Sequence, residues 1–343
     1  FQTDATGSNA SASNWAYFSS PEDGARVTKG WFKVVAPDRD GDDNTFKDYT
    51  NLATPTFAVG DSDDETERWY YADGDGNLEV GKIKKIKGKY YGFAPEGNKA
   101  GSMLTGLCAL RVDSNGNITK LWARDMDSDD LDDAMKHQGD FQTTGDYFGY
   151  SADDTLYYFG NNEDADGALK TGNVSVTLDG DSYQFQFSKT GGAEGKGRGL
   201  NGIDDGKYIY KFGQKLKAGS DDKYIVVDKA TKTVNGKTVV TYDKLDDAKD
   251  FMDQDDVVVT NLLENTTADT RVNIGNNSNK KAEDLTEAYK ISFTQSDEDV
   301  KHEYVLVNTS GKVIDSKGKN KDGNDYYYVT DSKGVITNVY VEN

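Results

Sequence analysis

Acidic and amide side chains near the first quarter of the chain have the spacing of a calcium loop. Asp73, Asp75, Asn77 and Glu79 fall at the first, third, fifth and seventh positions of an EF-hand loop. The twelfth position, where such a loop needs a bidentate glutamate, is Lys84, and the surrounding pattern is strand and turn rather than helix. The spacing therefore favours a turn. Asp73, Asp75 and Asn77 are kept as weak metal candidates, and no cofactor is expected.

The side chains that most enzymes use are scarce or unsuitably placed. The chain has one cysteine, Cys108, and two histidines, His137 and His302. These are too few to make a catalytic triad with histidine or a His/Cys metal site a strong expectation. Its 60 Asp and Glu residues could always supply a glycosidase pair, but none has the apolar context that raises a carboxyl pKa. The segment GGAEGKGRG (191–199) imitates a phosphate loop without the following Lys-Ser or Lys-Thr. We therefore expect no catalytic residues and no enzyme, with Cys108 buried and both histidines at the surface.

Composition disfavours two classes of partner and favours a β-rich fold. The 343 residues carry 40 Lys and Arg against 60 Asp and Glu, a net charge of −20 that repels nucleic acid and anionic membranes. No stretch has the roughly 18 uncharged apolar residues of a membrane helix, so no membrane insertion is expected. With 21 Tyr, 14 Phe and 36 Gly against 4 Pro, the chain favours strands and turns over helices.

A repeated unit runs along the chain. Each copy opens with an aromatic run, crosses a polar turn rich in Gly, Asp and Asn, takes a short second strand and usually closes on Gly. The clear copies are WAYFSSPEDGARVTKG (15–30), WYYADGDGNLEVG (69–81), YYGFAPEGNKAGSMLTG (90–106) and YYFGNNEDADGALKTG (157–172). Weaker copies begin at Tyr183, Tyr208, Tyr304 and Tyr326.

The physics of this unit is that of a β-hairpin. Alternate aromatic residues from Tyr183 to Phe187 lie on one face of a strand and can bury it. Turns at Gly76, Gly167 and Gly311 are expected to supply positive φ angles. A lone hairpin is marginal in water, so each copy must pack its aromatic face on its neighbours. We predict a mainly β fold, an array of stacked β-hairpin repeats resembling a β-solenoid, with small α+β insertions.

Interruptions of the repeat contain the predicted helices. In the segment 111–156, Leu131, Ala134 and Met135 have helical spacing after Ser128, a possible N-cap. In the segment 228–303, strands are predicted at 237–242 and 257–260, and also at KISF and HEYVLV. A short helix is predicted around Leu245, Ala248 and Met252. We therefore predict a short helix in the first interruption and a small α+β elaboration in the second.

These patterns predict the order of the domains. The chain, which starts at Phe1, is interpreted as a mature segment or an expression fragment. The predicted order is a flexible segment (1–14), hairpin repeats (15–110) with an acidic insertion (35–68), an insertion with a short helix (111–156), hairpin repeats (157–227), an α+β insertion (228–303) and C-terminal hairpin repeats (304–343).

The repeats carry a family resemblance. WYYADGDGNLEVGKIKKIKGKYYGF (69–93), GWFKVV (30–35) and DADGALKTG (164–172) resemble the cell-wall-binding repeats of Gram-positive (Firmicutes) surface proteins. That group includes choline-binding modules and the glucan-binding repeats of streptococcal glucosyltransferases and clostridial toxins. The resemblance covers 15–227 and resumes more weakly from Tyr304. It implies noncovalent attachment to wall glycopolymers or exopolysaccharide, with any catalytic or adhesive domain elsewhere.

The resemblance also implies where a ligand would bind. Choline-binding repeats use a Trp after the closing Gly, together with other aromatics, as a cation–π cage. Here that Trp is present as Trp31, whereas non-aromatic residues follow the other closing glycines: Lys82, Leu107, Asn173, Leu200, Ser220 and Lys319. A regular ladder of choline cages is therefore not expected. The candidate site for a sugar ring or a cation is the cluster Trp15, Tyr17, Trp31, Trp69 and Tyr70.

Two functions remain open from the sequence. The first is a noncatalytic module that anchors a secreted protein to the bacterial surface by binding a cell-wall glycopolymer or extracellular glycan. The second is a structural stalk or protein-interaction module in which every aromatic lies in the core. The two differ in the burial of Trp15, Trp31 and Trp69, because a ligand can stack only on an exposed ring.

Overall fold

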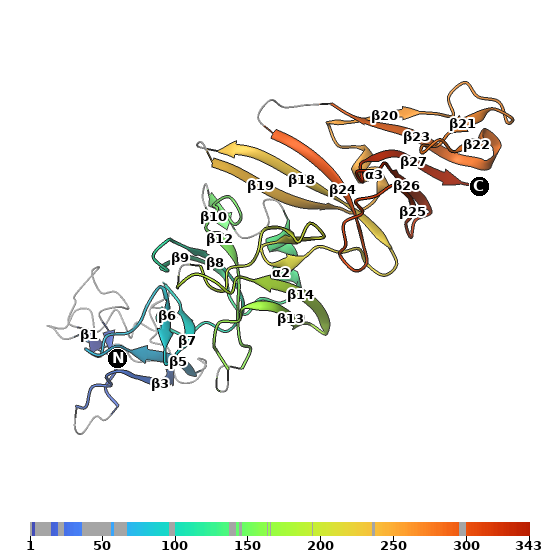
Figure 1. The fold of residues 1–343 in the computed structure, drawn as a ribbon. Coiled ribbons are helices and arrows are strands. Elements are labelled where there is room, and N and C mark those ends of the chain that lie inside the picture. Colours follow the sequence, from blue (N-terminus) through green and yellow to red (C-terminus); the bar gives the residue numbers. More distant parts are fainter. Residues whose placement is uncertain are drawn as a thin grey trace. The chain divides into compact units, whose positions relative to one another are not determined.

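The computed structural model describes most of the chain as two compact units. The described residues are 2–3, 15–19, 24–35, 56–57, 67–95, 100–136, 142–143 and 146–343, without 163, 165, 194, 235–236 and 295–299. Unit 1 is Phe1–Gly199 and unit 2 is Leu200–Asn343. Both consist mainly of small antiparallel sheets, which confirms the predicted mainly β fold (Figure 1). The predicted segments 1–14 and 35–68 lie almost wholly outside the described residues.

Unit 1 is made of short strands and one helix. The strands are β1 (Gln2–Thr3), β2 (Trp15–Ala16), β3 (Gly30–Val35), β4 (Thr56–Phe57), β5 (Glu67–Ala72), β6 (Lys82–Ile86), β7 (Lys89–Phe93), β8 (Gly106–Val112), β9 (Ile118–Ala123), β10 (Gln142–Thr143), β11 (Asp146–Tyr147), β12 (Asp154–Phe159), β13 (Gly172–Leu178) and β14 (Asp181–Phe187). The helix is α2 (Ser128–Met135). Three-stranded sheets have the orders β2–β1–β4 and β12–β8–β9, and the other strands form the pairs β3–β5, β6–β7, β10–β11 and β13–β14.

The repeated unit pairs with the next copy rather than mainly with itself. Within a copy, the segment after the turn forms a single isolated β-bridge with the aromatic strand. In successive copies these bridges are Ala72–Leu78, Phe93–Met103, Phe159–Leu169 and Phe187–Gly199. The chain then passes a closing glycine of positive φ, at Gly81, Gly106 or Gly172. The strand after this glycine pairs along its length with the aromatic strand of the next copy, as β6 does with β7 and β13 with β14. Backbone hydrogen bonds therefore join successive copies.

The segment predicted as an insertion from residue 111 begins with a further hairpin. Strand β8 pairs with β9 around a turn in which Asp113 Oδ1 accepts hydrogen bonds from the N–H groups of Asn115 and Asn117 at 2.8 and 2.9 Å. This hairpin has no leading aromatic run, so the repeat pattern does not reveal it. The helix α2 follows as predicted, with Leu131 and Ala134 buried.

The N-cap predicted for this helix was wrong by one residue. The cap is Asp127, whose carboxylate accepts from the Asp130 N–H at 2.9 Å in a reciprocal capping box. The predicted cap, Ser128, instead donates its hydroxyl and its N–H to Asp179 at 2.7 and 2.9 Å. Asp179 lies far from Ser128 in the sequence, so local spacing could not show that the Ser128 hydroxyl donates to another residue instead of capping the helix.

Unit 2 contains longer strands. They are β15 (Gly202–Asp204), β16 (Tyr208–Lys211), β17 (Gln214–Lys215), β18 (Tyr224–Val234), β19 (Lys237–Leu245), β20 (Val257–Asn261), β21 (Arg271–Asn273), β22 (Asn279–Lys281), β23 (Leu285–Phe293), β24 (Val300–Asn308), β25 (Gly318–Lys321), β26 (Tyr326–Thr330) and β27 (Ile336–Glu342). The helices are α3 (Ala248–Met252) and the 3₁₀ turn η3 (Ala282–Asp284). The main sheets have the orders β19–β18–β24 and β20–β23–β27–β26–β25 (Figure 1).

The elements predicted in 228–303 are present, and they share a core with the rest of unit 2. Strands occur at the four predicted places, and the helix covers Ala248–Met252, while Leu245 ends β19. The predicted limits at 227/228 and 303/304 fall inside β18 and β24, which pair with each other over nine residue pairs from Tyr224–Asn308 to Lys232–Val300. One cluster buries Val226 and Phe251 with Tyr304, Tyr328 and Val339. The segment is thus part of a common sheet core.

Candidate functional site

A cavity of about 230 Å³ opens among three successive repeats of unit 1. Its aromatic walls are Trp31 on β3, Trp69 on β5 and Tyr91 on β7. Each of these rings is half-buried, so one side of the ring packs and the other remains accessible. The remaining lining residues are Lys89, Met103, Asp164, Asp166 and Gly167.

Strand pairing places the aromatic rings together. In the β3–β5 ladder Trp31 stands opposite Tyr71, and Lys33 stands opposite Trp69. Because alternate residues of a strand share a face, these four side chains project to the same side. The Trp31 ring then meets Tyr91 edge-on, with the ring centroids 4.9 Å apart, and Tyr71 at 5.1 Å. Trp69 is 6.4 Å from Trp31, at an interplanar angle of 84°.

Buried apolar residues hold this aromatic wall from behind. Phe93, fully buried, lies 5.8 Å from the Trp31 ring. Met103 bridges Phe93 in the backbone ladder and donates its N–H to the carbonyl of Trp69 at 2.7 Å. Ile86 completes the cluster. The rings are therefore set by a packed core rather than by loops, which is the arrangement of a preformed site.

The polar wall comes from the turn of the fourth clear repeat. Asp164 Oδ1 accepts hydrogen bonds from Trp69 Nε1 and from Lys33 Nζ, both at 2.9 Å. Lys33 and Trp69 together hold the pKa of Asp164 below its ordinary value. Asp166 is paired with Lys170, which likewise lowers the pKa of that carboxyl. Both carboxylates at the cavity are thus ionised near neutral pH, and each has a lysine partner.

Two glycines permit this turn to approach the aromatic wall. A Cβ on Gly167 would lie 2.4 Å from Met103 Cε, and a Cβ on Gly160 would lie 1.6 Å from the carbonyl oxygen of Asp166. Gly167 was expected to need a positive φ, and this was wrong, because it is not among the positive-φ residues. Close packing, rather than backbone conformation, requires glycine at this position.

The Gly160→Ala variant is expected to displace the turn that carries Asp164 and Asp166. The clash is with backbone rather than with a flexible side chain, so the expected loss of stability is about 1–3 kcal/mol and ligand affinity should fall with it. Urea unfolding and ligand titration measure the two effects. The matched control is Gly74→Ala, where a Cβ meets nothing within 4 Å. Equal behaviour of the two variants would contradict the assigned role of Gly160.

The structure brings together only part of the predicted cluster. Trp31 and Trp69 line the cavity. Tyr70 does not, and its prediction as a ligand residue is corrected, because it is fully buried and stacks on Phe32 at 5.7 Å. Tyr17 stacks on the same Phe32 at 4.6 Å and is not among the lining residues. The side chain of Trp15 lies outside the described residues.

Tyr91, Asp164 and Asp166 were missed by the sequence reasoning. A signal for Tyr91 exists, since it is the second aromatic of the repeat that follows Trp69, two residues before Phe93 on the same strand face. The two aspartates carry no local signal. They lie in a turn rich in acidic residues, and only the stacking of the repeats shows that this turn faces Trp69.

The candidate metal residues form a hydrogen-bonded turn. Asp73 Oδ1 accepts from the N–H groups of Asp75 and Asn77 at 2.9 and 2.8 Å. Gly76 has a positive φ, 83°, as predicted. Glu79, 2% exposed, is paired with Lys82 at 2.6 Å and Lys84 at 2.8 Å. Within the part of the chain that the structure describes, no group of three or more His, Cys, Asp or Glu is placed to hold a metal ion.

Among the described residues, neither the single cysteine nor a histidine lines the cavity. Cys108 is a free thiol, fully buried as predicted, and burial raises its pKa to about 12. His137 lies outside the described residues. His302 is half-buried rather than at the surface, and its Nδ1 lies 2.8 Å from a carboxylate oxygen of Asp228.

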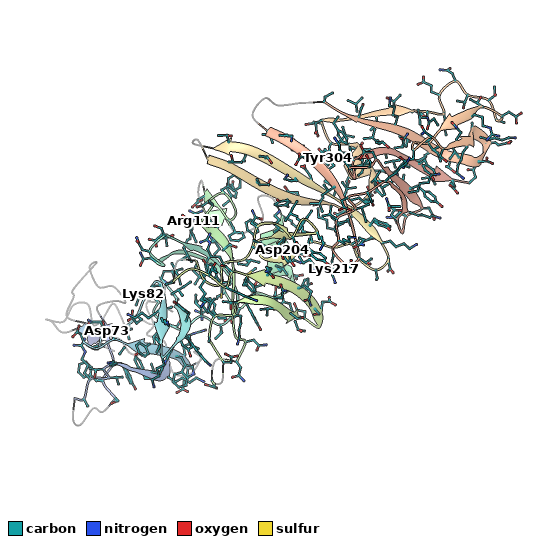
Figure 2. All side chains as sticks on the ribbon, in the orientation of Figure 1. Asp73, Lys82, Arg111, Asp204, Lys217 and Tyr304 are labelled. Atoms are coloured by element: carbon teal, nitrogen blue, oxygen red, sulfur yellow. The ribbon has the colours of Figure 1, made fainter. Side chains whose placement is uncertain are left out.

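A second cluster of charges brings two carboxylates together without forming an acid–base pair. Arg111, which is labelled in Figure 2, lies on β8. It donates to Asp154 through Nε at 2.9 Å and to Asp146 through Nη1 at 2.7 Å. Trp122 Nε1 also donates to Asp154, at 3.0 Å, and the Trp122 ring lies under the Lys120 ammonium at 4.1 Å. Hydrogen bonds from Arg111, and then from Lys120, lower the pKa of Asp146 to about 2. This cluster ties the hairpin β8–β9 to β11 and β12.

Acid is expected to weaken this cluster between about pH 4 and pH 2. The folded pKa of Asp146, about 2, lies below its ordinary value of 3.8, so its stabilising effect is complete above pH 4 and is lost as the pH falls through 2. Asp146 is 35% exposed, so the effect should stay below about 1 kcal/mol. The urea midpoints of wild type and Asp146→Asn should converge as the pH falls to 2. A constant difference would contradict the assignment.

Comparison with known proteins finds solved structures that resemble this chain with low sequence identity and low TM-scores. No protein-family model and no curated protein matches the chain. Among solved structures, a crystal structure of choline binding protein F from Streptococcus pneumoniae is 17% identical over 79% of this chain and 76% of that chain, with a TM-score of 0.15. A second, in the presence of a peptidoglycan analogue, is 14% identical over 92% and 82%, with a TM-score of 0.18.

A third solved structure is an alternansucrase in complex with isomaltononaose. It is 15% identical over 78% of this chain but only 14% of that chain, with a TM-score of 0.16. These TM-scores do not establish a common three-dimensional arrangement. Among the described residues, no helix has the length and apolarity to cross a membrane.

Proposed function

We propose that this chain is a noncatalytic glycan-binding repeat module and that the cavity of unit 1 holds a sugar residue. The observation that carries the proposal is the open aromatic wall of Trp31, Trp69 and Tyr91 facing the carboxylates Asp164 and Asp166. Aromatic rings offer apolar faces to the C–H faces of a sugar, and ionised carboxylates accept hydrogen bonds from its hydroxyl groups.

The size of the cavity is consistent with the binding of one sugar residue of a longer glycan. Its volume of about 230 Å³ is below the roughly 300–1,000 Å³ of pockets that enclose a drug-sized ligand. Each aromatic contact contributes on the order of 1 kcal/mol, so one such site binds weakly. Attachment to a polymer of repeating sugars would then depend on several contacts acting together.

The charges at the cavity favour a neutral glycan. Asp164 and Asp166 each have a lysine partner, Lys33 and Lys170, so the wall has little unbalanced charge for an organic cation. The net charge of −20 also repels an anionic wall polymer. A neutral wall or extracellular polysaccharide is therefore the proposed partner, at the surface of the bacterium that secretes the protein.

The same carboxylates argue against glycoside hydrolysis. A glycosidase keeps one carboxyl protonated near neutral pH, which requires a raised pKa. The pKa values of Asp164 and Asp166 are both lowered by their hydrogen bonds to lysine and tryptophan side chains. The cavity can accept hydrogen bonds from a sugar but has no proton donor of this kind, which supports a binding role.

The stalk interpretation is less well supported by the burial of the aromatics. It requires Trp31 and Trp69 to be enclosed in the core, as Tyr70 and Phe93 are. Both tryptophans are instead half-buried and line an open cavity. We therefore assign Tyr70 and Phe93 to the core of the repeats, and Trp31 and Trp69 to binding.

Retention on polysaccharides tests the proposal. The protein is applied to purified bacterial cell walls and to insoluble neutral glucans, and soluble oligosaccharides of the retained polymer are then titrated by calorimetry. Binding should persist in excess tetramethylammonium chloride if the ligand is neutral. No retention on any wall or glucan would overturn the proposal, and elution by tetramethylammonium at constant ionic strength would overturn the assignment to a neutral glycan.

A further inference from the structure

A second cavity, of about 380 Å³, lies within unit 2. It is formed by β15, β18, the end of β23, β24 and the loop after it, and the turn between β26 and β27. Its apolar lining consists of Ile203, Phe293, Val305, Val313, Ile314 and Val335. The volume is within the usual range of small-molecule sites, roughly 300–1,000 Å³.

The mouth of this cavity collects exposed apolar side chains. Ile203, Phe293 and Val335 are 40%, 40% and 39% exposed. They are half of the large hydrophobic side chains that are exposed among the described residues, the others being Tyr150, Val258 and Val259. The chain as a whole is strongly polar, with a mean hydropathy of −0.79. Three such residues around one opening are typical of a binding site rather than of an ordinary surface.

One wall of the cavity is a row of nearly parallel rings. Phe293 stacks on Tyr304, with centroids 5.6 Å apart at an angle of 17°, and Tyr304 lies 6.2 Å from His302 at 12°. His302 and Tyr304 are alternate residues of β24 and share a face. The Tyr304 hydroxyl donates to the buried Asp256, which holds the ring in place. Phe293, which is 40% exposed, is the ring of this row that is most accessible to an aromatic ligand.

The polar lining of the cavity consists of Lys229, His302, Glu303, Asp315 and Lys333. His302 Nδ1 lies 2.8 Å from a carboxylate oxygen of Asp228, which is 7% exposed. A carboxylate at Nδ1 favours the tautomer in which Nδ1 carries the proton, and in that tautomer Nε2 is a hydrogen-bond acceptor. No partner of Nε2 occurs among the described residues. The nearby Glu303 is already paired with Lys229 at 2.5 Å and Lys301 at 2.8 Å.

We propose that this cavity binds a small aromatic alcohol, a compound with a planar apolar body and one hydroxyl group. The body packs against Phe293 and the aliphatic side chains, and the hydroxyl donates to His302 Nε2. A sugar fits less well, because it carries hydroxyl groups around the whole ring, whereas Ile203, Phe293 and Val335 present apolar side chains to it. The site belongs to unit 2 and is independent of glycan binding in unit 1.

The probe for this site is 2-naphthol, followed by NMR of the histidine rings in the full chain. Because the chain has only two histidines, the spectrum of His137→Gln assigns the His302 signal. Titration should shift the His302 ring signal saturably and leave that of His137 unchanged. The analogue 2-methoxynaphthalene, which cannot donate, should bind about three- to tenfold more weakly, the effect of one hydrogen bond.

Matched variants separate the cavity from general surface adsorption. Val335→Asp puts a charge at the mouth and should weaken 2-naphthol binding at least about fivefold. Val258→Asp changes an equally exposed valine outside the cavity, 40% against 39%, and should leave the affinity within about twofold. The absence of a saturable His302 shift, or equal effects of the two variants, would overturn the site. Equal affinity for both naphthalene compounds would overturn the assignment of the hydroxyl group.

Discussion

Replacing Trp31 with alanine is expected to lower glycan affinity about 30-fold or more. Trp31 is the central ring of the wall, in contact with Tyr71, Tyr91 and Phe93 as well as Trp69. Truncation of a central aromatic in a binding site typically costs at least about 2 kcal/mol, and each 1.4 kcal/mol is a tenfold change. Calorimetric titration with the oligosaccharide that binds wild type measures the effect without relying on tryptophan fluorescence.

The control for this variant is Trp122→Ala. Trp122 is also half-buried and lies in unit 1, but it contacts Lys120 and Asp154 and does not line the cavity. This variant should keep wild-type affinity under conditions where it remains folded. Trp69→Phe should have an intermediate effect, because it keeps an aromatic ring but removes the donor to Asp164. A folded Trp31→Ala protein with wild-type affinity would refute the proposed site.

Replacing Arg111 with methionine is expected to destabilise unit 1 by about 3–5 kcal/mol. Arg111 is the cationic partner of Asp154, whose side chain is 0% exposed. Removal of one member of a buried ion pair leaves the other charge uncompensated, and this is the usual cost. The remaining donors to Asp154 are Trp122 Nε1 and two backbone N–H groups, which are neutral. Urea unfolding of the full chain should show an early transition for unit 1 and an unchanged one for unit 2.

Two further variants decide whether the effect comes from the buried charge. Asp146→Asn removes the more exposed partner, which is 35% exposed, and should cost less than about 1 kcal/mol. The double variant Arg111→Met/Asp154→Leu removes both buried charges and should recover much of the stability lost by the single variant. A single Arg111→Met variant as stable as wild type would contradict this account of the cluster.

The repeat and its strands follow from the sequence because they depend on local pattern. Alternating aromatics predict Phe185 and Phe187 on one face, and both are buried and stacked 5.5 Å apart. The strands and helix within 228–303 were also predicted. The repeat pattern does not predict the hairpin β8–β9, because this hairpin lacks an aromatic opening. The prediction of Ser128 as the cap is wrong, because its distant partner Asp179 has no local signal.

The candidate site was predicted in part, for a related reason. Trp31 was found because it follows a closing glycine, and Trp69 because it opens a repeat. Tyr70 was placed in the site beside Trp69, but adjacent residues of a strand point to opposite faces, so one enters the core while the other lines the cavity. Asp164 and Asp166 could not be chosen among 60 acidic residues by sequence alone.

The sequence by itself determined a β-rich chain of aromatic repeats with acidic turns and few residues suited to catalysis, because composition and alternation are local properties. Only the tertiary structure decided which turn meets which ring. Backbone pairing of one repeat with the next places Trp31 beside Tyr91, and close packing at Gly160 and Gly167 brings Asp164 to Trp69. Contacts between residues 95 positions apart in sequence depend on the stacking of whole repeats, which no local pattern records.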